Sequence, residues 1–460
     1  MIISDILDQI KATSAKEVIK NSIALANNNS QYHALLNLTE ERALKRADEV
    51  DNGKITGKLA GVPFVVKDNF LAFGAPTTAA SKMLEKFNAP LQATAVEKLE
   101  AEGAICIGKA NLDAFAHGGS TENSAFGPTK NAVDLTRVAG GSSGGSAVVT
   151  ALNIVPFALG SDTGGSIRQP ASFNGVVGVK PTYGTVSRYG VVAMASSTDV
   201  MGTFTTNVAD AELVMSIIAG KDERDMTTLP DFFTVLSEAK QNQKIGLIKD
   251  FMTNDVDSEV RDKVNEYVEK LRANGHIVEE VNLPMAEYAL AIYYIIVPAE
   301  ISSNLARFDG IRYGHRADGV KTLAELYGRT RDEGFVTENK RRIMIGSYVL
   351  SSGFFDAYYL QAQKARTLLV NEFNELFKKY DGLIGPVAPT PAFKLGENTA
   401  DPIKMYLNDI MTVPTSLAGL PSISVPAGVS KSGLPIGVQL MGPRRSDAAL
   451  LALARSLEGK

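Results

Sequence analysis

Short apolar runs alternate with helical windows and glycine clusters between residues 61 and 202 of this chain. Each run spans four to seven residues, the usual length of a β-strand, and the glycines between the runs indicate turns. Alternation of strand-like and helical segments is typical of an α/β sheet. The predicted strands are Val62–Val66, Ala104–Ile107, Ile154–Gly160 and Val176–Val179.

The flanking regions have a more helical pattern. Residues up to about 50 are expected to be helical, and Ser14 with Glu17 three residues later has the spacing of a capping box. A strand, an amphipathic helix and a strand then predict a βαβ-like unit. Residues 285–380 are expected to be mainly helical, and residues 381–442 return to short strands. The three segments of the βαβ-like unit are Ile245–Ile248, Val256–Asn274 and Ile277–Val281.

No Pro/Ser-rich linker or solenoid repeat divides the 460 residues. We therefore predict a single α/β domain over residues 1–460, with a large mixed β-sheet covered by α-helices on both faces. Residues 1–60 would form a helical N-terminal segment and residues 61–202 the core. Residues 203–460 would supply the rest of the sheet and the helices of a substrate pocket.

Charge and composition exclude several functional classes. The net charge is -4, which argues against unaided binding to a phosphate backbone. The single cysteine, Cys106, has no intramolecular partner, which fits a reducing compartment. The first residues carry acid rather than Lys or Arg, and the longest apolar stretch, residues 147–160, is too short for a membrane span. We therefore expect a cytoplasmic protein with no membrane segment.

Two serines lie inside glycine clusters, in Gly140–Ser146 and in Ser161–Arg168. Glycine lets main-chain N–H groups approach a ligand closely, so such clusters suit an oxyanion hole. One cluster alone would more often be a flexible loop. Two clusters joined by a strand-and-helix segment favour a catalytic site that contains both serines.

A serine hydroxyl needs a base to become a nucleophile, and the usual base is histidine. The four histidines of this chain are scattered and have no recognisable partner. Lys67 is the better candidate, because it ends the apolar run 62–66 and burial would lower its pKa toward the neutral form. A lysine at a strand end is otherwise more often a solvated surface cation.

A nucleotide site is excluded at Gly103–Lys109, which matches the start of a P-loop. The residue after Lys109 is Ala110 rather than Ser or Thr. The strand-like residues also lie between the two glycines, whereas a P-loop has its strand before the first glycine.

The segments Gly61–Asn69, Gly140–Ser146 and Ser161–Arg168 together resemble the core motifs of the amidase signature family. Lys67 stands 75 residues before Ser142, and Ser142 stands 24 before Ser166, which is the family's order and spacing. The resemblance implies the amidase signature fold and a Ser-cisSer-Lys triad with Ser166 as nucleophile, Ser142 as relay and Lys67 as base. It also implies a cis peptide before Ser142, and an oxyanion hole and supporting residues at Thr163, Gly164, Gly165, Ser166, Ser143, Asp162 and Arg168.

In the second half, Ser302–Gly314, Lys340–Ile343 and Asn408–Pro421 resemble one branch of this family, the A subunits of glutamyl-tRNA(Gln)/aspartyl-tRNA(Asn) amidotransferases. The resemblance implies a glutamine pocket in which Arg342 binds the α-carboxylate, Asp409 the α-ammonium and Tyr293 a further polar group. The segment Phe115–Ser120, with Gly118, is expected beside this pocket. His117 stands there where the family usually has Met, and it would be a neutral replacement, an altered pocket wall or a group that titrates near neutral pH.

The same resemblance implies a glutaminase that passes ammonia to partner B and C subunits in a heterotrimer. ATP, Mg²⁺ and the misacylated tRNA, Glu-tRNA(Gln) or Asp-tRNA(Asn), are expected mainly on the B subunit, with no cofactor and no metal in this chain. A stand-alone amidase acting on another small amide is the alternative. A catalytically silent scaffold is a third hypothesis, against which the intact Lys67, Ser142 and Ser166 argue.

Overall fold

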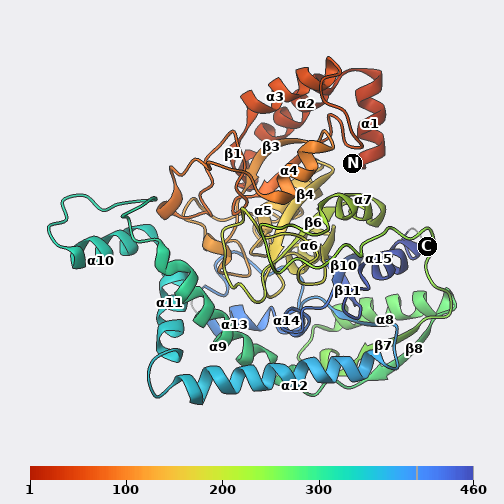
Figure 1. The fold of residues 1–460 in the computed structure, drawn as a ribbon. Coiled ribbons are helices and arrows are strands. Elements are labelled where there is room, and N and C mark those ends of the chain that lie inside the picture. The colour runs from red at the N-terminus through yellow and green to blue at the C-terminus, as the bar shows by residue number, and fades with distance from the viewer. Residues whose placement is uncertain (400–401, 459–460) are drawn as a thin grey trace.

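A computed structural model describes residues 1–399 and 402–458 and contains one mixed sheet of eleven strands (Figure 1). The strand order is β1-β3-β2-β4-β6-β5-β10-β11-β9-β7-β8. The strands are β1 (Leu35–Leu38), β2 (Pro63–Lys67), β3 (Ile105–Ala110), β4 (Phe157–Asp162), β5 (Val177–Lys180), β6 (Val200–Thr205), β7 (Lys244–Ile248), β8 (Ile277–Val281), β9 (Gly382–Pro386), β10 (Ser422–Val429) and β11 (Pro435–Met441).

The sheet is parallel near its two ends and antiparallel in between. Strand β2 lies parallel to β3 and β4, and β7 lies parallel to β8 and β9. The strands from β4 through β6, β5, β10 and β11 to β9 pair antiparallel, and so does β1 with β3. The βαβ-like unit predicted from residue 245 onward is therefore part of the same sheet as the motif-bearing strands.

Helices cover both faces of this sheet, as the sequence predicts (Figure 1). The helices are α1 (Ile3–Ala12), α2 (Ala15–Asn28), α3 (Glu40–Asp51), α4 (Thr94–Ala101), α5 (Gly144–Ala151), α6 (Arg168–Asn174), α7 (Val208–Ile218), α8 (Ser258–Ala273), α9 (Ala286–Asn304), α10 (Leu323–Gly334), α11 (Thr337–Val349), α12 (Leu360–Phe377), α13 (Pro402–Leu407), α14 (Val413–Leu417) and α15 (Asp447–Ser456).

Alternate residues of strand β2 pack into different cores. Phe64 and Val66 join a cluster with side chains of α4 and α7, whereas Val65 joins a cluster with side chains of α2, α3 and α5. Successive side chains of a strand point to opposite faces of the sheet. Lys67 therefore shares the face of Val65, which is the face that α5 covers.

The structure corrects several sequence expectations at the amino-terminal end. Residues 35–38 form the edge strand β1 inside the segment expected to be helical, and they pair with β3. The Ser14 side chain caps α2 by accepting from the Glu17 N–H at 3.1 Å. Within the described residues, the Glu17 side chain does not bind the Ser14 N–H in return, so the capping box is incomplete. Strand β4 begins at Phe157 rather than at residue 154, because α5 continues to Ala151 and a turn follows.

Helix α9 is the one described helix long and apolar enough, by length and composition alone, to cross a membrane. Half of its most apolar window is buried inside the fold, where Ile292, Tyr293 and Ile296 join a core cluster. Its apolar character thus supplies core contacts, and it carries Tyr293 into the interior.

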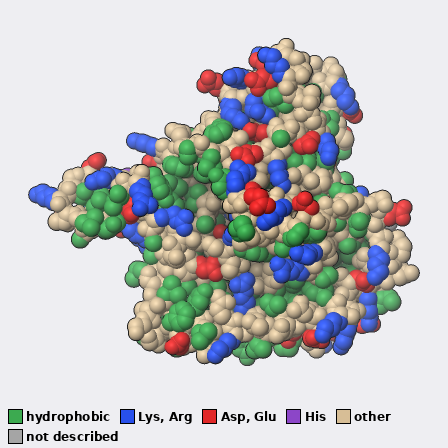
Figure 2. Space-filling model, in the orientation of Figure 1, with side chains coloured by type: hydrophobic (Ala, Val, Ile, Leu, Met, Phe, Trp, Pro, Cys, Tyr) green, Lys and Arg blue, Asp and Glu red, His purple; other side chains and the backbone are tan. Residues whose placement is uncertain are grey.

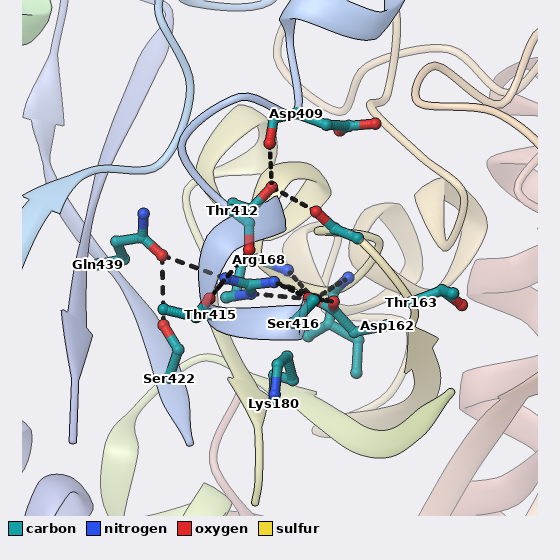
Figure 3. Close-up of polar contacts among 12 residues, drawn as sticks. Asp162, Thr163, Arg168, Lys180, Asp409, Thr412, Thr415, Ser416, Ser422 and Gln439 are labelled. Carbon is teal, nitrogen blue, oxygen red and sulfur yellow. Dashed lines mark hydrogen bonds and ion pairs between the residues drawn. The ribbon is translucent and has the colours of Figure 1, made fainter. Parts of the chain in front are cut away.

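A buried ion pair joins the end of β4 to the start of α6 (Figure 3). Arg168 donates from Nε and Nη2 to the two carboxylate oxygens of Asp162, at 3.1 and 3.0 Å, and both side chains are fully buried. Burial alone would raise the pKa of Asp162, but the Arg168 guanidinium outweighs burial and holds that pKa below its usual value.

Arg168 also reaches the carboxy-terminal part of the chain (Figure 3). It donates to Thr415 Oγ1 at 2.6 Å and Ser416 Oγ at 2.8 Å in α14, and to Gln439 Oε1 at 3.2 Å in β11. Every hydrogen-bonding nitrogen of the guanidinium therefore has a partner. The segment between Asp162 and Arg168, which includes Ser166, is fixed against strands and helices from the opposite end of the sequence.

We predict that Arg168→Met lowers the free energy of unfolding by about 3–5 kcal/mol, because it removes the guanidinium that pairs with the buried Asp162 carboxylate. Urea denaturation followed by circular dichroism would measure the loss. Arg329→Met is the matched control, since Arg329 pairs with Glu333 on the surface and should cost less than about 1 kcal/mol. Equal losses in the two variants would contradict the role assigned to the buried pair.

Candidate functional site

Lys67 is the last residue of β2, and its side chain is fully buried. Its Nζ lies 2.7 Å from Ser142 Oγ, 2.9 Å from Ser161 Oγ and 3.3 Å from the Ser161 carbonyl oxygen. The sequence could not exclude a solvated surface cation at this position. The structure places the amine instead in a closed polar pocket between two serines.

Burial lowers the pKa of Lys67 to about 7. Removing an ammonium from water is costly, and the carboxylates of Asp113, Asp162 and Asp199 offset only part of that cost. A large fraction of the Lys67 side chains is therefore neutral near pH 7. An amine in that state can accept a proton from a hydroxyl group.

Ser142 lies just before α5, on a peptide that is cis between Gly141 and Ser142, as the resemblance implies. Its carbonyl oxygen accepts from the Asp113 N–H at 3.3 Å. The neighbouring Ser143 donates from its N–H to the Ser166 carbonyl at 3.2 Å and from its hydroxyl to the Ser161 carbonyl at 3.1 Å. Ser143 thus binds the Ser166 turn and the end of β4 to the start of α5, while Ser142 faces Lys67.

Ser166 stands in the turn between β4 and α6 and is 7% exposed. Within residues 1–399 and 402–458, its hydroxyl makes no hydrogen bond, and the N–H groups of Gly164, Gly165 and Ser166 have no acceptor. The structure therefore brings Lys67 and Ser142 into direct contact and leaves the Ser166 hydroxyl unpaired next to three free main-chain donors.

At two positions of this turn, neighbouring side chains lie so close that only glycine fits. A Cβ on Gly164 would lie 2.8 Å from the Tyr293 hydroxyl oxygen, and one on Gly165, whose φ is +150°, would lie 2.2 Å from Thr412 Oγ1. Thr412 donates to the Gly164 carbonyl at 2.6 Å, and Thr163 donates to Asp199 at 2.8 Å. The backbone of the turn is thus fixed on both sides while its N–H groups stay free.

Asp113 is a buried carboxylate of this site that sequence reasoning missed. It accepts from the main-chain N–H groups of Thr121 at 2.9 Å and Asn123 at 3.0 Å. A Cβ on Gly118 would lie 2.4 Å from Asp113 Cγ, so the glycine allows the pocket segment to cross directly over the carboxylate. Burial raises the pKa of Asp113 to about 6. The sequence offers no signal for it beyond an acid at the end of an apolar strand.

Arg342 is buried on α11, and in this structure its partner is Glu338. Its Nε donates to Glu338 Oε1 at 2.8 Å, and its guanidinium lies over the rings of Tyr294 and Tyr406, 5.2 and 5.5 Å from their centroids. Tyr406 donates to the same Glu338 oxygen at 3.0 Å. Sequence reasoning missed Glu338, although its spacing of four residues from Arg342 on a predicted helix is a recognisable ion-pair pattern.

Asp409 follows α13, and its side chain extends away from the Arg168 network (Figure 3). A Cβ on Gly119 would lie 3.6 Å from its carboxylate oxygens, which puts Asp409 against the segment that holds Gly118. Burial raises the pKa of Asp409 to about 8, with Arg342 acting in the opposite direction. A cationic group bound beside this carboxyl would favour its charged form.

His117 is fully buried, and its Nδ1 lies 2.7 Å from the Asn339 side-chain nitrogen. Burial and the nearby Arg342 charge hold the pKa of His117 well below its ordinary value. Titration near neutral pH, one of the possibilities raised by the sequence, is therefore wrong. The imidazole is a neutral part of the packing between the Gly118 segment and α11.

A small cavity of about 60 Å³ lies beside Arg342 and the Gly118 segment. Its lining includes Gly118, Ser120, Glu338, Arg341, Arg342 and Tyr406. A larger hollow of about 310 Å³ beside His33 and Asn37 contains none of the candidate residues. In the described part of the chain, no cluster of three or more His, Cys, Asp or Glu side chains is arranged to hold a metal ion.

Lys109, the last residue of the P-loop-like segment, is a buried strand residue. It forms an ion pair with Asp68 at 3.1 Å and donates to Thr77 at 3.0 Å. Its ammonium therefore balances the charge of the residue that follows Lys67, and no loop is present there to surround a phosphate.

Comparison with known proteins gives a consistent result. Residues 17–451 match the amidase family. The chain is 50% identical to the A subunit of the glutamyl-tRNA(Gln) amidotransferase of Lactiplantibacillus plantarum, over 97% of this chain and 93% of that protein. It is also 50% identical to the protein of the same name from Gloeobacter violaceus, over 97% and 94%.

Solved structures show the same fold. The A subunit of the glutamyl-tRNA(Gln) amidotransferase of Thermotoga maritima superposes with a TM-score of 0.84 at 40% identity, covering 100% of this chain and 94% of that one. A bacterial aryl acylamidase of the amidase signature family superposes with a TM-score of 0.86 at 26% identity, covering 100% and 96%. The present chain therefore belongs to the amidase family and, within it, to the A subunits of glutamyl-tRNA(Gln) amidotransferase.

Proposed function

We propose that this chain is the glutaminase subunit of a glutamyl-tRNA(Gln) amidotransferase and that Lys67, Ser142 and Ser166 are its catalytic residues. The observation that carries the proposal is the buried Lys67 amine, 2.7 Å from Ser142 Oγ and with a pKa lowered to about 7. This pair replaces the histidine that a serine hydrolase ordinarily uses. Family membership supplies the substrate, glutamine.

In the proposed reaction, neutral Lys67 accepts the proton of Ser142, and Ser142 accepts that of Ser166 as Ser166 Oγ attacks the glutamine carboxamide carbon. The tetrahedral oxyanion accepts hydrogen bonds from the free N–H groups at Gly164, Gly165 and Ser166. The C–N bond then breaks. The departing nitrogen receives the proton from Lys67 through Ser142 and leaves as ammonia. Water hydrolyses the glutamyl ester by the same proton route and regenerates Ser166.

The proposed pocket recognises both charges of the amino acid. Arg342 would bind the α-carboxylate, with Glu338 retained on its Nε edge, and Asp409 would bind the α-ammonium. The hydroxyl of Tyr293, which lies close to Gly164, would contact the substrate beside the reacting carbon. Gly118 lines the cavity beside Arg342 and would border the substrate. A stand-alone amidase acting on another small amide would not require this pair of opposite charges.

The remaining expectations concern the assembly, and we propose them from family membership. This chain works as one domain in the cytoplasm, with B and C subunits in a heterotrimer. The B subunit holds ATP, Mg²⁺ and the misacylated tRNA, Glu-tRNA(Gln) and also Asp-tRNA(Asn) where the cell makes it. The present chain needs no cofactor, because its chemistry uses only serine hydroxyls, a lysine amine and main-chain N–H groups.

Ser166→Ala should abolish glutamine-dependent amidation of Glu-tRNA(Gln) by the assembled enzyme, with a loss of about 10³-fold or more, because no acyl-enzyme can form. Amidation from added ammonium salts should continue, since it bypasses the ester. Formation of radiolabelled Gln-tRNA measures both the glutamine-dependent and the ammonium-dependent reaction. Ser143→Ala is the control and should retain measurable glutamine use. Full glutamine-dependent activity in Ser166→Ala would refute the mechanism.

The rate of glutamine hydrolysis should fall as the pH drops below about 7, because protonated Lys67 cannot accept a proton. Burial sets this pKa, and Asp113 is the anion that raises it most. Asp113→Asn should therefore shift the acid limb of kcat/KM to lower pH. A pH–rate profile of both proteins tests this. An acid limb at the same pH in the two profiles would show that Lys67 does not titrate in this step.

Arg342→Ala should raise KM for glutamine by about 10²-fold or more, because a bidentate charged contact is lost, while amidation from ammonium stays intact. Arg341→Ala is a matched control, since Arg341 also pairs with Glu338 but is 40% exposed. Steady-state kinetics with glutamine and with ammonium as nitrogen donor distinguish the Arg342→Ala variant from the Arg341→Ala variant. Loss of ammonium-dependent amidation in Arg342→Ala would instead indicate a structural role.

A further inference from the structure

The Lys67 amine differs from most cations of this protein in what surrounds it. On the visible face of the molecule, Lys and Arg side chains reach solvent, several of them beside Asp or Glu (Figure 2). Lys67 is fully buried, and in the described part of the chain no carboxylate forms an ion pair with it. The acids that act on it from a distance are Asp113 after β3, Asp162 at the end of β4 and Asp199 before β6. Its immediate neighbours are uncharged hydrogen-bonding groups.

Two of the three polar atoms within reach of the amine belong to Ser161. The Lys67 Nζ lies 2.7 Å from the Ser142 hydroxyl oxygen, 2.9 Å from Ser161 Oγ and 3.3 Å from the Ser161 carbonyl oxygen. A protonated lysine has three N–H groups, whereas a neutral one has two N–H groups and a lone pair. The three oxygens therefore match the ammonium that forms when Lys67 takes the proton of Ser142.

The Ser161 hydroxyl determines where the lone pair of neutral Lys67 points. The Ser161 carbonyl oxygen can only accept, so it takes one N–H group. When the Ser161 hydroxyl accepts the second N–H group, the lone pair is left facing Ser142, whose proton it must receive. If the Ser161 hydroxyl turned away, or donated its own proton to the amine, an N–H group would face Ser142 and the transfer could not begin.

Asn69 holds the Ser161 hydroxyl next to the amine. Its Nδ2 donates to Ser161 Oγ at 3.0 Å, and Asn69 is 2% exposed. A serine side chain has three staggered rotamers, and the bond from Asn69 favours the one in which Oγ also reaches Lys67. The Asn69 Oδ1 is buried and has no hydrogen-bond partner among the described residues. An unsatisfied buried oxygen destabilises the fold, which points to a role for Asn69 other than stability.

We propose that Asn69 and Ser161 are positioning residues for the base Lys67. Ser161 takes the N–H groups that the amine does not direct at Ser142, and Asn69 fixes the Ser161 hydroxyl for this purpose. As the Ser142 O–H bond breaks and the new N–H bond forms on Lys67, Ser142 receives the proton of Ser166, and the ammonium keeps all three acceptors. This inference rests on the proposed function, because it deepens the role given there to Lys67.

The test measures glutamine hydrolysis by the assembled enzyme as a function of pH. In Ser161→Ala, the plateau of kcat/KM should fall about tenfold or more, since the lone pair is no longer directed at Ser142. The acid limb should move to lower pH by about one unit, because the ammonium loses one acceptor. Asn69→Leu should change both in the same direction, with a smaller shift. The loss should lie in kcat rather than KM, because neither residue lines the cavity beside Arg342.

A double variant tests whether Asn69 acts through Ser161. In the Ser161→Ala background, Asn69→Leu should add no further shift of the acid limb, because the hydroxyl that Asn69 holds is already absent. Asn69→Ala repeats the measurement with a smaller side chain that cannot overpack the site. Thr203→Val is the control, since it removes a buried hydroxyl of the neighbouring strand β6 that donates to the Ala158 carbonyl at 3.2 Å. Its pH profile should be that of the wild type.

An acid limb at the wild-type pH in Ser161→Ala and in both Asn69 variants overturns the inference. A limb that moves to higher pH also overturns it, because that shift indicates only that water has entered the pocket and hydrated the ammonium. Additive shifts in the double variant would exclude the route from Asn69 through Ser161. Glutamine-dependent amidation that survives in Ser166→Ala would instead overturn the proposed function, whatever the Asn69 variants do, so the two failures are distinguishable.

Discussion

The buried ion pair between Asp162 and Arg168 determines where Ser166 lies. The two residues flank the turn that carries the serine, and each charge is compensated mainly by the other and by uncharged hydrogen-bonding groups. Because neither charge can reach water, the pair fixes the distance between the end of β4 and the start of α6. The glycines at 164 and 165 then let Tyr293 and Thr412 approach the turn without closing it.

The electrostatics of the site balance one amine against several carboxylates. Burial pushes Lys67 toward its neutral form, whereas Asp113, Asp162 and Asp199 favour its charged form. Asp162 is largely compensated by Arg168, and Asp199 by the Thr163 hydroxyl and the N–H groups of Met194 and Ala195. Among residues 1–399 and 402–458, the hydrogen-bond donors to the Asp113 carboxylate are main-chain N–H groups, and Asp113 is the main counter-charge that remains for Lys67.

Sequence patterns predict the parts of this protein that depend on local chemistry. The predicted strand 277–281 and the predicted helix after residue 256 agree with the observed bounds within two residues, and the helix has a clear apolar periodicity. Motif spacing pairs Lys67 with Ser142, and their side chains are in contact. The edge strand β1 escapes prediction because its four half-buried residues follow a helical region without a strong alternation.

The unpredicted residues act through neighbours distant in sequence. Asp113, Thr412 and Lys109 contact the site only after the sheet has formed, and no local pattern indicates their partners. His117 is noticeable as unusual, but its neutral state follows from burial and from the Arg342 charge on α11. Glu338 has a readable helical spacing and is easily overlooked beside the more prominent cationic run of residues 340–342.

The contacts of Arg168 also set the time at which the chain becomes competent during its synthesis. Three of its acceptors lie 247, 248 and 271 residues further along the sequence. A growing chain that has emerged only as far as α13 has Lys67, both serines and the Asp162–Arg168 pair, yet it lacks three of the acceptors of Arg168 and the Thr412 hydroxyl that binds the Gly164 carbonyl. Domains fold as units, and contacts between distant segments form late. The turn that carries Ser166 therefore gains its last fixing contacts only when the final part of the chain has been synthesised.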